Sequence, residues 1–81
     1  MIIAYNQTEE HLLFKQLSVP NGVLLPSTSI ILTDFNKIYE IQSDEELKNY
    51  VSIGKILIDI GDGILTKENS LLFFDSIFLK R

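Results

Sequence analysis

Short apolar runs separated by turn-forming residues fill the first part of the chain. Residues 1–5 form one run, and residues 11–17 form another in which side chains alternate as on the two faces of a pleated strand. Asn21 and Gly22 follow, a pair typical of hairpin turns because both residues tolerate a positive φ. These signals predict a small, mainly antiparallel sheet built from strands within residues 1–33.

A helical period replaces the strand pattern in the middle of the chain. Ser43 and Glu46 have the spacing of a capping box, in which each side chain accepts a hydrogen bond from the other residue's backbone amide. One apolar stripe follows, at Leu47, Tyr50 and Val51. Gly54 stands where a residue with a left-handed backbone would end the helix. A helix is therefore predicted over residues 44–53, and a short helical turn over residues 35–41.

The last third of the chain predicts one more strand and one more helix. Residues 55–60 carry isoleucine at every second position, as one face of a strand does, and residues 61–63 predict a tight turn. Thr66 has the side chain of an N-cap for a helix over residues 67–79. Apolar residues surround nearly the whole of that helix. Because such runs also occur in buried strands, a strand over residues 70–79 is the alternative.

Together these elements predict an α+β fold with a small, mainly antiparallel sheet and two short helices. The chain is expected to form a single small domain over residues 1–81. Its elements are strands within residues 1–33, a helix over residues 44–53, a strand over residues 55–60 and a helix over residues 67–79.

The size of the chain limits how much apolar surface this fold can bury. A chain of 81 residues, 46% of them hydrophobic, hides only about 60% of its unfolded surface, and without cysteine it has no disulfides. Since a helix that is apolar on several sides needs several contacts, we expect self-association through exposed apolar residues. The candidate interface residues are Phe73, Phe74, Phe78, Leu79, Tyr39 and Tyr50. Core packing is the alternative role for the phenylalanines and the two tyrosines.

Charge and hydropathy argue against several classes of partner. Eleven acidic and seven basic residues give a net charge of −4, so no basic face for non-specific nucleic-acid binding is expected. No apolar run approaches the roughly 20 residues that cross a bilayer, and residues 1–10 lack the pattern of a signal peptide. Neither nucleic acid nor a membrane is predicted as a partner.

The sequence offers few residues for catalysis or metal binding. His11 is the only histidine, cysteine is absent, and no serine lies in a nucleophile-elbow motif. A calcium loop starting at Asp59 would need oxygen ligands at its third and fifth positions and glutamate at its twelfth, where Gly61, Gly63 and Ser70 stand. We therefore predict no catalytic residues, no metal site and no cofactor.

The stretch from Leu24 to Ile77 carries an ordered series of turn and cap signals. In chain order these are Leu24-Leu25-Pro26, Ile30-Ile31-Leu32-Thr33-Asp34-Phe35-Asn36, Glu40-Ile41-Gln42, Asp44-Glu45-Glu46-Leu47, Tyr50-Val51, Gly54-Lys55-Ile56, Asp62-Gly63 and Leu65-Thr66-Lys67. The arrangement resembles small domains in structural proteins of tailed bacteriophages, found in head, neck and tail-fibre components. The resemblance covers about two thirds of the chain.

The resemblance implies a bacteriophage virion structural protein with no catalytic residues. The expected role is a head accessory or decoration protein, a head-fibre component or a tail component, acting by protein–protein assembly. The expected partners are other virion proteins or copies of itself, in a homo-oligomer or in many copies within the virion, after production in the host cytoplasm. The alternative is a small phage-encoded regulator or inhibitor that binds a host protein.

Overall fold

Two antiparallel sheets organise the fold, in a computed structural model that describes the backbone of residues 1–79 and the side chains of residues 1–74. In the larger sheet, the strand order is β4-β1-β5, with β1 (Ile3–Asn6) between β4 (Ser29–Ile31) and β5 (Ile56–Asp59). The smaller sheet pairs β2 (Leu12–Leu13) with β3 (Val23–Leu24). The predicted antiparallel arrangement is confirmed, but it is divided between two sheets.

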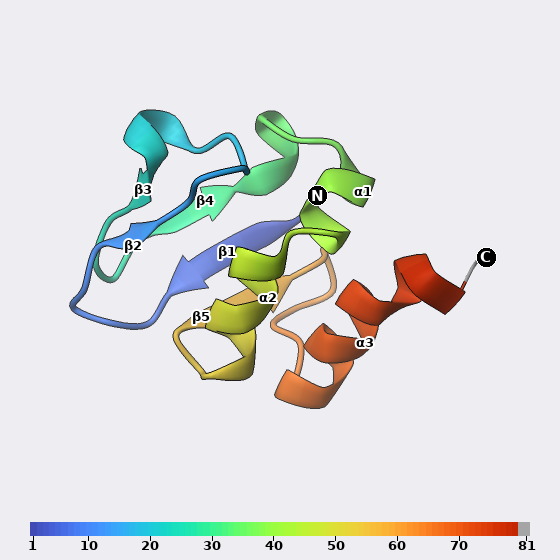
Figure 1. The fold of residues 1–81 in the computed structure, drawn as a ribbon. Coiled ribbons are helices and arrows are strands. Elements are labelled where there is room, and N and C mark those ends of the chain that lie inside the picture. Colours follow the sequence, from blue (N-terminus) through green and yellow to red (C-terminus); the bar gives the residue numbers. More distant parts are fainter. Residues whose placement is uncertain (80–81) are drawn as a thin grey trace.

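Helical segments supply the rest of the described fold. They are α1 (Ile38–Gln42), α2 (Glu45–Ser52), α3 (Lys67–Leu79) and the 3-10 turns η1 (Pro20–Gly22) and η2 (Leu32–Asp34). Figure 1 shows α1 and α3 at the right of the molecule, β2, β3 and η1 at the left, and α2 between them. The α+β class is confirmed. Three α-helices replace the predicted two, because the short helical turn expected over residues 35–41 forms a helix, α1. Residues 67–79 form a helix, α3, and not the alternative strand over residues 70–79.

The core lies between the larger sheet and the helices. Ala4 in the central strand pairs with Ile30 of β4 and Ile58 of β5, and both Ala4 and Ile58 are completely buried. Helices α2 and α3 pack against β5 and against each other. Among the described side chains, the buried apolar ones that they contribute are Leu47, Val51 and Phe74. The strand of residues 55–60 is confirmed as β5, with Ile56 and Ile58 on the buried face.

The predicted strand over residues 11–17 is mostly wrong. Only two of its residues pair, as β2, and the chain then leaves the ladder while still burying Phe14 and Leu17 in the core. Asn21 and Gly22 do adopt positive φ values of 60° and 69°, but they close η1 rather than a two-residue hairpin turn. Alternating burial in this segment therefore comes from an irregular loop that folds back onto the core.

The predicted capping box at the start of α2 is also wrong, by one residue. Asp44 is the N-cap, and its carboxylate accepts a hydrogen bond from the Leu47 amide at 2.8 Å. Ser43 instead ends α1 and donates its hydroxyl to the Tyr39 carbonyl at 2.7 Å. The Glu46 carboxylate accepts from the Lys15 amide at 2.7 Å. Because α1 runs to Gln42, Ser43 is committed to the end of one helix and cannot begin the next.

The predicted end of α2 at Gly54 is confirmed. Gly54 has a φ of 82°, and its amide donates to the Val51 carbonyl at 3.1 Å. The Lys55 amide donates to the Tyr50 carbonyl at 2.9 Å, which completes the hydrogen-bond pair of a Schellman motif. Thr66 is likewise confirmed as the cap of α3, since its hydroxyl accepts from the Asn69 amide at 3.1 Å.

A buried amide, Asn6, joins the two sheets. Its Nδ2 donates to the carbonyls of Glu10 at 2.8 Å and of Leu24 and Leu25 at 3.1 Å each. Its Oδ1 accepts from the amide and the hydroxyl of Thr8, at 2.8 and 2.7 Å. The side chain therefore connects the end of β1 to the following loop and to the end of β3.

We expect Gly54→Val to lower the free energy of unfolding by about 1–2 kcal/mol, because a β-branched residue is strained at positive φ. No atom lies within 4 Å of a Cβ built at Gly54, so crowding does not contribute. Gly54→Asn, which tolerates this conformation better, is the matched control and should cost less. Denaturant unfolding of both variants measures the difference, and equal losses would contradict the backbone explanation.

We expect Asn6→Ala to lower the free energy of unfolding by roughly 2–4 kcal/mol, because it leaves buried carbonyls without a donor. Gln7→Ala is the control: its side chain is exposed, and such surface changes usually stay within about 0.5 kcal/mol. Urea unfolding followed by circular dichroism compares the two. Similar midpoints for both variants would show that Asn6 does not carry the connection between the sheets.

Candidate interaction surface

Two of the phenylalanines predicted for the interface, Phe73 and Phe74, have side chains that the structure describes, and both pack at the core. The side chain of Phe74 is completely buried, and Phe73 is partly buried against the core cluster. Their rings pack edge to face, with centroids 5.3 Å apart and an interplanar angle of 73°. The Phe73 carbonyl also accepts from the Gln42 amide group at 3.1 Å, which ties α3 to α1. Phe74 as an interface residue is therefore wrong for this fold, because no part of it reaches the surface.

Tyr50 is a structural tyrosine. Its hydroxyl donates to the Leu13 carbonyl at 2.9 Å, and its ring packs edge to face on Phe14 with centroids 5.5 Å apart. A half-buried tyrosine that satisfies a strand carbonyl in this way fixes β2 against α2. The alternative role stated for Tyr50, core packing, describes these contacts better than the interface role.

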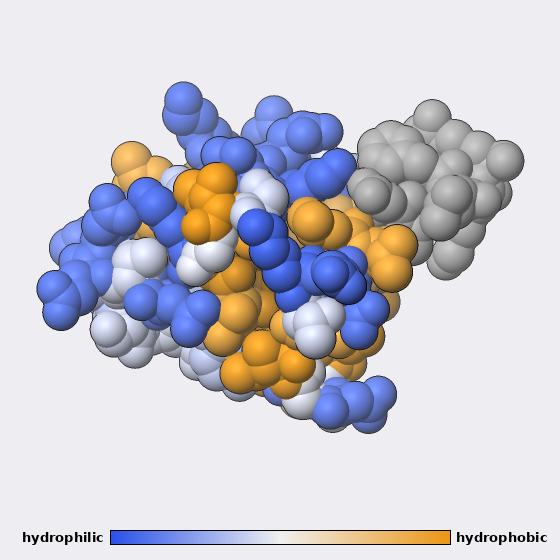
Figure 2. Space-filling view, turned by 90° about the horizontal axis from the view of Figure 1, so that it is seen from below, coloured by the Kyte–Doolittle hydropathy of each residue, from blue (hydrophilic) through white to orange (hydrophobic). Residues whose placement is uncertain are grey.

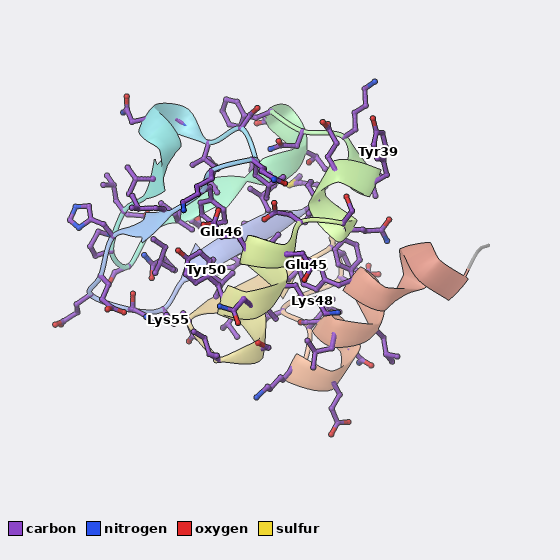
Figure 3. All side chains as sticks on the ribbon, viewed as in Figure 1. Tyr39, Glu45, Glu46, Lys48, Tyr50 and Lys55 are labelled. Atoms are coloured by element: carbon purple, nitrogen blue, oxygen red, sulfur yellow. The ribbon has the colours of Figure 1, made fainter. Side chains whose placement is uncertain are left out.

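Tyr39 lies on the surface, apart from Tyr50. In Figure 3 its side chain extends outward from α1, whereas Tyr50 lies lower, on α2. The Tyr39 side chain is 56% exposed, and its neighbours Ile38 and Phe35 are 56% and 49% exposed. We call Ile38 and Tyr39 the α1 patch, since Phe35 lies before α1 and lines a pocket with Leu25 and Ile30. The sequence named Tyr39 alone, although the exposed apolar neighbours lie within five residues of it.

The side chains of Phe78 and Leu79 lie outside the described part of α3. Within the described part, Leu72 is an exposed apolar residue of this helix, while Ser70 and Phe74 are buried. The four predicted interface residues whose side chains the structure describes therefore do not form one surface. Phe74 is buried, Phe73 and Tyr50 are half-buried against the core, and Tyr39 faces outward from α1. Figure 2 shows further hydrophobic residues, in orange, across the middle of the face that it presents.

Acidic residues at the start of α2 serve the helix. Burial raises the pKa of the Asp44 carboxyl above its ordinary value of 3.8, the hydrogen bond from the Leu47 amide lowers it, and the neighbouring charges of Glu46 and Glu45 raise it again. Figure 3 shows Glu45 and Glu46 on the turn that opens α2. Negative charge near a helix N-terminus also suits the helix dipole.

The aspartate at the end of β5 organises a turn. Oδ1 of Asp59 accepts from the Gly61 amide at 2.7 Å and from the Gly63 amide at 3.2 Å. Both glycines have positive φ, at 118° and 110°. Within residues 1–74, no three histidine, aspartate or glutamate side chains come together as a group that could hold a metal. The Asp59 carboxylate therefore acts as a backbone acceptor in this structure.

The helices and three comparisons with known proteins bear on the wider setting of the chain. None of the helices that the structure describes is both long enough and apolar enough to cross a bilayer. No protein-family model, curated protein or solved structure matches the chain.

We expect Asp44→Asn to be more stable than the native chain at neutral pH, and the difference to disappear below pH 3.8. With its raised pKa, folded Asp44 holds a proton more readily than the unfolded chain does. Its contribution to stability is therefore fully present below pH 3.8 and is lost as the pH rises through the folded value. Asparagine keeps the cap but carries no charge.

Thermal unfolding at several pH values tests this expectation. Asp44→Ala is the control, because it removes both the charge and the cap and should cost about 1 kcal/mol. A native chain that is more stable than Asp44→Asn at neutral pH would contradict the sign of the effect.

Proposed function

We propose that this protein is a structural component of a bacteriophage virion that acts through protein–protein contacts. The role is that of a head accessory or decoration protein, a head-fibre component or a tail component. The observation that carries the proposal is the α1 patch, in which the adjacent side chains of Ile38 and Tyr39 are each 56% exposed.

The α1 patch is a favourable contact surface on energetic grounds. Full burial of a large apolar side chain is worth about 1.5–3 kcal/mol relative to exposure, so half-exposed side chains keep a substantial part of that free energy for a partner. A ring such as Tyr39 also loses little conformational freedom when a partner covers it. Burial of this patch between subunits would make the stability of the protein depend on its concentration.

The resemblance of residues 24–77 to small domains of tailed-phage structural proteins supports the choice of a virion as the assembly. The acidic net charge of −4 fits contacts with proteins better than contacts with nucleic acid. In this function, other virion proteins or further copies of the chain cover the α1 patch.

We expect the double variant Ile38→Glu/Tyr39→Glu to associate at least tenfold more weakly than the native chain, because charges in a buried apolar contact lose hydration. Leu13→Glu is the matched control, since Leu13 is equally exposed but lies on β2. Sedimentation over a wide concentration range compares the three proteins. Equal association of native and double-variant chains would remove the α1 patch from the contact.

Mass spectrometry of purified phage particles tests the virion itself. The expected result is the chain in many copies per particle. Recovery of the chain only from the host lysate, bound to a host protein and absent from particles, would contradict the proposal and favour the regulator.

A further inference from the structure

The two outer edges of the larger sheet differ in how they are covered. Along β5, Ile64 forms a bridge with Asp59, and the Leu65 amide donates to the Ile58 carbonyl at 2.8 Å. Along β4, no strand within the described residues pairs on the side away from β1, because β2 and β3 form a separate sheet. One edge is therefore partly covered by the protein's own chain, at Ile58 and Asp59, and the other is open.

The open edge presents backbone groups at Ser29 and Ile31. On the β1 side, the Thr28 carbonyl accepts from the Asn6 amide, and the Leu32 amide donates to the Ile2 carbonyl, both at 2.8 Å. Because backbone groups alternate in direction along a strand, the amides of Ser29 and Ile31 point away from β1. Edge strands are commonly protected by short length, lysine, proline or a bulge. β4 is short, at three residues, but the sequence Ser29-Ile30-Ile31 contains neither lysine nor proline.

A pocket of about 370 Å³ lies beside this edge. It opens between two segments of the chain, residues 20–25, which include η1 and β3, and residues 28–35, which include β4 and η2. A turn joins the two segments, and in it the Thr28 amide donates to the Leu25 carbonyl at 3.3 Å. Its lining consists of Pro20, Asn21, Val23, Leu24, Leu25, Thr28, Ser29, Ile30 and Phe35. None of these residues carries a charge, although the chain has a net charge of −4.

We propose that the β4 edge and this pocket receive an extended, uncharged, mainly apolar segment of another polypeptide, which adds to the sheet as a strand. The outward amides call for a partner whose own backbone is extended, since only a strand presents carbonyls at the matching spacing. The uncharged lining selects against acidic and basic segments, because a charged side chain in the pocket would lose hydration without gaining a counter-charge. Alternate side chains of the added strand enter the pocket.

This site goes beyond the proposed virion role and does not depend on it. The α1 patch can be lost without changing Ser29 or the pocket walls formed by Val23 and Leu25. A partner strand at β4 would be recognised by its conformation and its lack of charge, whatever assembly it belongs to.

The test uses a short capped peptide that alternates threonine and valine, added to the isotope-labelled full chain. We expect nuclear magnetic resonance shifts at the amides of Ser29 and Ile31, slower hydrogen exchange there, and shifts at the methyl groups of Val23 and Leu25. The control peptide has the same side chains but is N-methylated at alternate residues along the edge that would face β4. It should not bind, since it cannot pair with the strand.

Two variants locate the site. Ser29→Pro removes one outward amide and should weaken binding about tenfold, the equivalent of one hydrogen bond. Leu25→Lys places a charge in the pocket and should weaken binding at least as much, without touching the strand. Ile53→Lys is the matched control, because Ile53 is similarly exposed but lies at the end of α2. Circular dichroism checks that each variant is folded. If Ser29→Pro does not fold, the binding of Leu25→Lys tests the proposal.

Three results would overturn the proposal. The first is equal binding of the plain and N-methylated peptides, and the second is the absence of binding by the plain peptide or shifts confined to other surfaces. The third is a dimer of the chain that dissociates in Ser29→Pro, which would identify a second copy of β4, and not a foreign segment, as the occupant of the edge.

Discussion

The hydrogen bonds of the Asn6 side chain are the constraint on which the arrangement of the two sheets depends. The smaller sheet has only two residue pairs, and a two-stranded sheet of that size is marginal by itself. Asn6 reaches from the end of β1 to the carbonyls of Leu24 and Leu25, where β3 ends and the chain turns toward β4. It thereby sets where β3 lies relative to β4. The pocket between residues 20–25 and 28–35 and the open edge of β4 both follow from that placement.

The core is completed by residues that belong to no strand or helix. Phe14, Leu17 and Val19 lie in the irregular segment between β2 and η1, and all three are in the buried cluster. A small domain has few regular elements from which to build a core, so loop residues must supply part of its apolar interior. Tyr50 holds this segment from the other side, by its edge-to-face contact with Phe14 and its bond to the Leu13 carbonyl. The loop is therefore held to the core by its buried side chains and by the contacts of Tyr50.

Local signals could be predicted from the sequence, and signals that depend on distant contacts could not. Gly54 and Thr66 act through backbone groups within a few residues, so the predictions that they end α2 and cap α3 are confirmed. The prediction that Ser43 caps α2 is wrong because its hydroxyl donates to the Tyr39 carbonyl at the end of α1. The role of Tyr50 depends on Leu13, 37 residues away, and that of Asn6 on Leu24, 18 residues away. Nothing in the sequence near these residues indicates such partners.

Helix α3 shows why apolar composition was a poor guide to which side chains are exposed. Ser70 and Phe74 are one turn apart and form the buried face of its described part, so a small serine lies beside a large buried ring. Leu72 then faces outward, as the all-round apolar pattern requires. Other exposed apolar side chains occur in the α1 patch, on the rim of the β4 pocket at Leu25 and Phe35, and at Met1, Leu13, Ile53, Ile60 and Ile64. Apolar surface spread over separate faces suits a protein with neighbours on more than one side, because each contact can form without blocking the others.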